Sequence, residues 1–107
     1  MAIKLKKMEC DGRIELYYWK DSQNREVDFV IKQGLKITHL IQVCYDASDI
    51  KTFKREVDAL FKASHELNCE NLLLLTETLN WKKFLNRKLK QKIKFMSICE
   101  WLLIKEL

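Results

Sequence analysis

The residues best suited to chemistry are two acids, Glu26 and Asp28, in the segment Arg25–Gln33, which reads REVDFVIKQ. The segment has the apolar and polar alternation of a β-strand, in which residues two apart point to the same face. We therefore expect both acids on one face. The other face would then carry Val27, Phe29 and Ile31. Since carboxylates are poor strand formers, two of them on one face need a reason.

A neighbouring strand offers possible partners for the acids. Lys36–Tyr45 reads as the next strand, and a hairpin around Gly34 can bring Asp28 near Gln42, with Cys44 on the same face as Gln42. An acid opposite an oxygen-bearing side chain is a candidate Mg²⁺ site, because hard cations take oxygen ligands. The alternative for Asp28 is a surface carboxylate that is salt-bridged to Arg25 or Lys32.

The elements that must position these residues follow from composition and periodicity. Apolar residues at steps of three and four predict a helix over 48–68, with Ser48 or Asp49 as N-cap and Asn68 as its end. The run Leu72–Leu75 suggests a strand buried on both faces. Strands are predicted over 13–20, 26–32, 36–45, 70–78 and 92–98, with a short helix over 80–90 and a short helix or tail over 99–107.

This order, β-β-β-α-β-(α)-β-α, predicts an α/β or α+β domain with one mixed sheet. The 107 residues suit a single domain, and 48% hydrophobic residues suffice for a core. The apolar runs are too short to span a bilayer and the N-terminus has no apolar signal region, so we expect a cytoplasmic protein with no membrane partner.

The cysteines and the charged residues further narrow the classes of function. Four cysteines are scattered without metal-knuckle spacing, so we expect free, mostly buried thiols. The formal net charge is +5, and residues 81–94 hold seven basic residues and no acid. This run is either a solvated lysine face or a surface that contacts nucleic-acid phosphates. Its candidate contact residues are Lys82, Lys83, Arg87, Lys88 and Lys90.

The phrases YYW, REVDFVI and LIQVCYD, followed by a helix, resemble the core of the PD-(D/E)XK nuclease superfamily. More closely, the chain is similar to the C-terminal nuclease-like domain of archaeal P-loop ATPases, over about residues 13 to 104. The resemblance implies a restriction-endonuclease-like mixed sheet flanked by helices. Residues 1–107 would be one nuclease-like domain, either a complete protein or a C-terminal fragment of a larger ATPase. The chain itself contains no P-loop motif.

The resemblance also assigns roles. Asp28 matches the metal-binding Asp, Gln42 falls at the second acid, Cys44 falls at the lysine and Glu26 is an outer acid. A neutral amide weakens Mg²⁺ or Mn²⁺ binding, and a thiol supplies no positive charge to the reaction.

The implied function is a degenerate domain that binds DNA or docks on a partner, with little or no cleavage. The alternative is an active, divalent-metal-dependent DNA endonuclease. The implied partners are DNA, a P-loop ATPase domain in the same or another chain, and a second copy joined through an open sheet edge.

Overall fold

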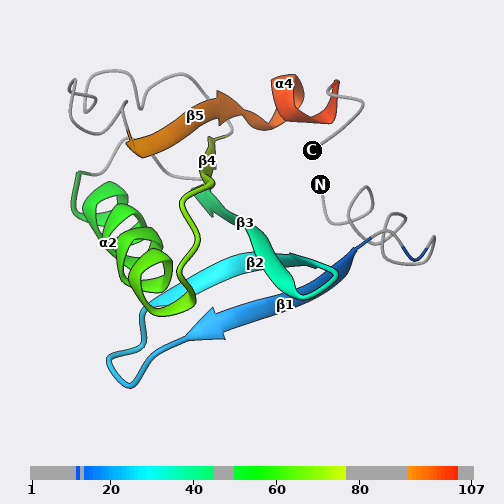
Figure 1. Ribbon diagram of the computed structural model, residues 1–107. Helices are drawn as coiled ribbons and strands as arrows, with labels where there is room; N and C mark the ends of the chain where they lie inside the picture. The colour runs from blue at the N-terminus through cyan, green and yellow to red at the C-terminus, as the bar shows by residue number, and fades with distance from the viewer. Residues whose placement is uncertain (1–11, 13, 45–49, 77–91, 104–107) are drawn as a thin grey trace.

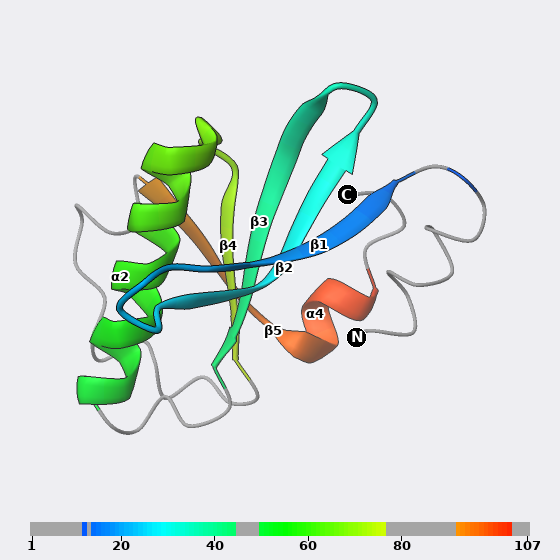
Figure 2. The same ribbon diagram turned by 90° about the horizontal axis from the view of Figure 1, so that it is seen from below.

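Five strands form one mixed sheet with helices packed against it (Figures 1 and 2). The computed structural model describes residues 12, 14–44, 50–76 and 92–103. Within them the elements, labelled as in Figure 1, are β1 (Glu15–Lys20), β2 (Glu26–Gln33), β3 (Lys36–Cys44), α2 (Ile50–Leu67), β4 (Leu72–Thr76), β5 (Ile93–Ser97) and α4 (Ile98–Leu102).

The strands lie in the order β1-β2-β3-β4-β5. The first three pair antiparallel as a meander, and β3, β4 and β5 pair parallel. Helix α2 makes the crossover between the parallel strands β3 and β4, as such a connection requires. The predicted mixed α/β fold is therefore confirmed. The helix predicted over 80–90 lies outside the described residues.

Local conformation sets the ends of these elements. Gln33 pairs with Lys36, which leaves Gly34 and Leu35 as a two-residue turn, and Gly34 has the positive φ of 66° predicted for it. Asn68 ends α2 with a φ of 53°, a left-handed conformation that asparagine tolerates. The predicted N-cap residues, 48 and 49, lie outside the described residues.

The face pattern of β2 differs from simple alternation. Between two successive pairs in the β1–β2 register, β1 advances by two residues and β2 by three, which is the signature of a β-bulge. As a result Val27 and Val30 both pack on the α2 side of the sheet, whereas Phe29 and Ile31 pack on the opposite side with Trp101 of α4. The prediction that Val27, Phe29 and Ile31 share one face is therefore wrong, because the bulge shifts the alternation.

Two apolar clusters hold the layers together, one on each face of the sheet. The apolar stripe of α2, with Phe53, Val57 and Leu60, packs against one face, and Trp101 of α4 packs against the other. Strand β4 lies between the clusters, and all five of its residues are buried, as its apolar run predicted. The central strands are thus fixed from both sides.

Two further predictions concern the thiols and the membrane. Cys44 and Cys69 are buried free thiols, as expected, but Cys99 is exposed. Among the described residues, neither helix has the length and apolar character that crossing a bilayer would need.

Candidate functional site

The side chain of Gln42 connects β3 to β2 beyond the point where their backbone pairing ends. The last paired residues there are Phe29 and Ile41. One residue further along β3, Gln42 Oε1 accepts a hydrogen bond of 2.9 Å from the Asp28 N–H, and Gln42 Nε2 donates one of 2.6 Å to the Glu26 carbonyl. Gln42 is 0% exposed. Its side-chain amide takes the hydrogen bonds of the β2 backbone that a β3 peptide group would make if the pairing continued. We call this pair of bonds the Gln42 latch.

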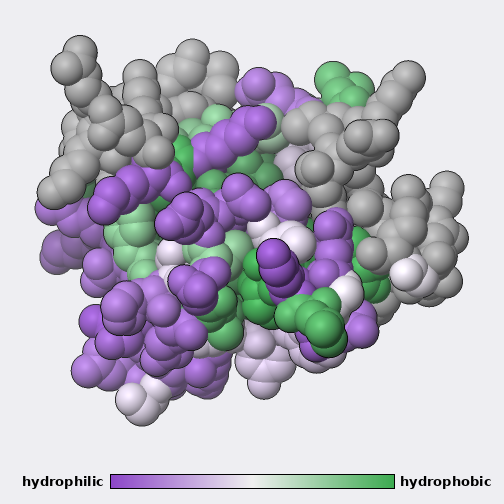
Figure 3. Space-filling model, viewed as in Figure 1, coloured by the Kyte–Doolittle hydropathy of each residue, from purple (hydrophilic) through white to green (hydrophobic). Residues whose placement is uncertain are grey.

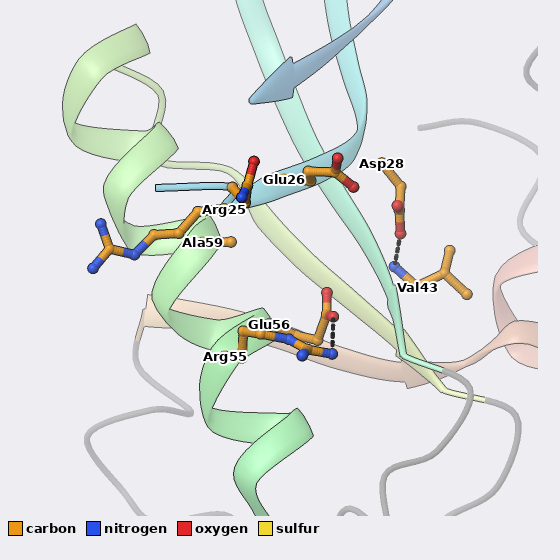
Figure 4. A pocket seen from close by; sticks show the side chains of 8 residues that line it. Arg25, Glu26, Asp28, Val43, Arg55, Glu56 and Ala59 are labelled. Carbon is orange, nitrogen blue, oxygen red and sulfur yellow. Dashed lines mark hydrogen bonds and ion pairs between the residues drawn. The ribbon is translucent and has the colours of Figure 1, made fainter. Parts of the chain in front are cut away.

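The carboxylate of Asp28 closes the same gap from the other strand. Its Oδ2 accepts a hydrogen bond of 2.9 Å from the Val43 N–H, and Figure 4 shows the side chain directed at Val43. Partial burial raises the pKa of Asp28, the Val43 N–H lowers it and the charge of Glu26 raises it. The expected partner Arg25 pairs instead with Asp21, at 3.3 Å. Asp28 is therefore an exposed acid bonded to the β3 backbone, and within the described residues it forms no ion pair with Arg25 or Lys32.

A pocket opens between this end of β2 and helix α2 (Figure 4). Its cavity volume is about 210 Å³, below the range of about 300–1,000 Å³ typical of pockets for drug-sized ligands. Three carboxylates line it: Glu26 and Asp28 from β2, and Glu56 from α2. Figure 4 shows the Arg25 side chain pointing away from Glu26 and Asp28, whereas Lys20 pairs with Glu26 at 3.5 Å and Arg55 with Glu56 at 3.9 Å.

Glu56 is the most perturbed acid of this pocket. Burial is the largest cause that raises its pKa, the charge of Asp28 also raises it, Arg55 lowers it and Glu26 raises it, and together they bring it to about 7. Its side chain is 21% exposed, and its ion pair with Arg55 Nη2 is long at 3.9 Å. Near neutral pH this carboxyl is therefore protonated in a large fraction of molecules.

Sequence reasoning missed Glu56, although the sequence holds a signal for it. Glu56 lies three residues after Phe53 and four before Leu60, on the apolar stripe that α2 turns to the sheet. An acid inside such a stripe must be buried at least in part, and buried acids with shifted pKa values mark candidate sites.

Of the predicted site residues, the structure brings together Glu26, Asp28 and Gln42. Cys44, at the position of the superfamily's lysine, is 2% exposed and packs in the apolar cluster beneath α2. The predicted nucleic-acid contacts at positions 82–90 lie outside the described residues.

Asp28 and Gln42 were predicted to hold Mg²⁺ or Mn²⁺, and their geometry does not fit that role. The Gln42 oxygen is buried and already accepts the Asp28 N–H, and one Asp28 oxygen accepts the Val43 N–H. In the part of the chain that the structure describes, no group of three or more His, Cys, Asp or Glu side chains is arranged to hold a metal ion.

Comparison with known families gives one match, to a family model over residues 4–99. The chain belongs to the DUF4143 family, a domain of unknown function. Searches of curated proteins and of solved structures find no match. The DUF4143 match spans all five strands and α2, so the Gln42 latch and the pocket both lie within the region that defines the family.

Proposed function

We propose that this chain is a degenerate nuclease-like domain of the PD-(D/E)XK kind, which binds DNA or docks on a partner and does not cleave. The observation that carries the proposal is the Gln42 latch. The side chain at the position of the second metal-binding acid is bonded to the β2 backbone on both sides, at Asp28 and at Glu26. It therefore stabilises the sheet rather than a cation.

The chemistry of hydrolysis supports the same proposal. Cleaving a phosphodiester requires an activated water and positive charge where negative charge develops. The position that would carry a lysine holds Cys44, which is buried in the core. The acids that remain line a pocket in which burial, ahead of the charges of Asp28 and Glu26, raises the pKa of Glu56 to about 7. A phosphate approaching this pocket would meet the carboxylates of Glu26 and Asp28.

The role of a module rests on the resemblance to the C-terminal domain of archaeal P-loop ATPases. In such an arrangement the ATPase part would supply the energy and this domain would supply contacts to DNA or to a partner protein. The formal net charge of +5 is consistent with a polyanionic ligand. Localisation in the cytoplasm belongs to the same proposal.

A cleavage assay tests the loss of chemistry. The purified chain is incubated with supercoiled plasmid and with linear duplex, in Mg²⁺ and separately in Mn²⁺, beside the variant Asp28→Ala. We expect no cleavage above background with either protein. Cleavage by the wild type that Asp28→Ala abolishes would establish the alternative, an active metal-dependent endonuclease.

A further inference from the structure

Two aromatic contacts bring α2 and β5 side by side, although they are far apart in the sequence. The rings of Phe53 and Phe95 stack with centroids 6.0 Å apart and planes 20° apart. The Nζ of Lys92, the residue before β5, lies 5.9 Å from the centroid of the Phe61 ring. The start of β5 is therefore held against the outer edge of α2, and side chains of both elements share one surface.

This surface gathers lysines. Lys54 lies seven residues before Phe61, on the same side of the helix, and Lys62 follows Phe61 directly. Together with Lys51 and Lys92 they form what we call the α2–β5 flank, and all four are exposed. The acid Asp58 also lies on this side of α2, which leaves the flank with a formal charge of about +3.

Three lysines of the flank, Lys54, Lys62 and Lys92, carry charge to the surface without a carboxylate partner among the described residues. Within residues 12, 14–44, 50–76 and 92–103, no carboxylate forms an ion pair with Lys54, Lys62 or Lys92. Figure 3 shows hydrophilic side chains gathered over α2 and the β1–β2 loop. The flank is therefore a hydrated cationic surface, in contrast to the acidic pocket on the inner side of the same helix.

We infer that the α2–β5 flank binds the phosphate backbone of nucleic acid without reading its sequence. The inference rests on the proposed binding role and names its surface. From Lys51 to Lys62 the helix rises by about 16 Å. A duplex presents about one charge per 1.7 Å of its axis, so about ten charges lie within that span. Flexible lysine stems reach phosphates without fixed geometry, and the described flank offers no fork of donors suited to a base edge.

An acidic protein fits this surface less well. Protein interfaces are depleted in lysine and depend on aromatic or arginine anchors that fill pockets at their centre. On the flank, Phe61 is only partly buried, but it lies beneath Lys92 and packs against the core. The lysines are thus the groups presented to a ligand, and a polyanion of high charge density is the ligand that suits them.

The test measures binding of the full chain to a short fluorescently labelled DNA duplex as a function of salt. The flank variant carries Lys54→Gln, Lys62→Gln and Lys92→Gln. The matched control carries Lys20→Gln, Lys32→Gln and Lys36→Gln, which removes the same charge from the β1–β2–β3 meander. Of these, Lys32 and Lys36 belong to the β2–β3 hairpin, whose tip lies away from α2 in both ribbon views, whereas Lys20 ends β1 and pairs with Glu26 at 3.5 Å.

We expect the flank variant to bind at least about tenfold more weakly near 0.1 M salt. The negative slope of log K against log salt should become shallower by about 2 to 3, because each lysine–phosphate contact contributes about 0.9 to its magnitude. The control should keep the wild-type slope within about 1. Equal losses in both variants, or no loss in the flank variant, would overturn the inference, and so would tighter binding of labelled polyglutamate than of duplex.

The outcomes separate this inference from the proposed function. DNA cleavage that depends on Asp28 overturns the loss of chemistry, whichever lysines bind. A wild-type chain that neither cleaves nor binds duplex leaves the loss of chemistry standing and removes the flank as a nucleic-acid surface.

Discussion

The two sides of helix α2 carry charged groups that differ in their burial and solvation. Its inner side turns Glu56 towards Glu26 and Asp28, where burial, together with the charges of these two acids, raises the pKa of Glu56 to about 7. Its outer side carries Lys54 and Lys62 in water, exposed and without described ion pairs. A charge on the inner side lowers the free energy of unfolding, because burial disfavours the ionised form. A charge on the outer side changes this free energy little, because water solvates it.

The two sides of α2 differ in how closely function and stability depend on the same residues. On the inner side, polar groups serve as structural bonds, since Gln42 and Asp28 complete the hydrogen bonding that the β2–β3 ladder leaves open. Changing them must alter the fold as well as any site. On the outer side, a lysine can be replaced with little effect on folding, so a change in binding there reports on binding alone.

The largest expected effect comes from removing the Gln42 latch. Gln42→Met keeps nearly the same shape but leaves the partly buried Asp28 N–H and Glu26 carbonyl without their partner. Each unsatisfied group costs about 1–3 kcal/mol, so we expect the free energy of unfolding to fall by about 3 kcal/mol. Urea denaturation followed by circular dichroism measures it.

The matched control for this prediction is Gln23→Met, in the exposed loop between β1 and β2. It should change stability by less than about 0.5 kcal/mol. A loss below about 1 kcal/mol in Gln42→Met would mean that water or rearranged backbone satisfies the two groups, and the latch would lose its structural role.

The sequence predicts some features of the Gln42 latch and of the fold around it, but not all of them. The mixed α/β class, the described strands and helix α2 followed from composition, because β-branched and aromatic runs, a stripe at steps of three and four, and Gly34 each favour one local structure. The closeness of Asp28 and Gln42 followed from a hairpin around Gly34. The direction of the Gln42 amide did not follow, because it depends on where the backbone ladder stops, and no local preference encodes that.

The bulge in β2 and the burial of Glu56 were missed for related reasons. A bulge inserts one residue by tertiary pairing, so Val27 lies on the face opposite Phe29 although the letters alternate evenly. Glu56 was readable as an acid in an apolar stripe, but its neighbours Glu26 and Asp28 come from a strand about thirty residues earlier, and only the packed fold puts the three together.

The second effect concerns the desolvated charge on the inner side. The folded pKa of Glu56, about 7, lies above its ordinary value of 4.5. Between these values the unfolded chain has lost the proton and the folded chain keeps it, so the free energy of unfolding falls as pH rises. We expect Glu56→Gln to be more stable than the wild type by about 2 kcal/mol at pH 8, allowing for partial solvent screening, and nearly equal to it at pH 4.5.

The control is Asp58→Asn, on the outer side of the same helix, where the side chain is exposed. It should leave both stability and its pH profile within about 0.5 kcal/mol of the wild type. Thermal melts across pH 4.5–8 measure all three proteins. A Glu56→Gln variant whose profile follows that of the wild type would show that the carboxyl is well compensated, and the contrast between the two sides of α2 would disappear.

We expect the smallest change in the free energy of unfolding from substitutions on the outer side of α2. Lys54→Gln and Lys62→Gln, singly or together, should change the free energy of unfolding by no more than about 0.5 kcal/mol, because both side chains are solvated. Urea denaturation at low and at high salt measures it, and the two curves should shift equally for wild type and variant. A loss above about 1 kcal/mol would reveal a partner for these lysines that contributes to folding. Weaker duplex binding by the flank variant could then no longer be assigned to lost phosphate contacts alone.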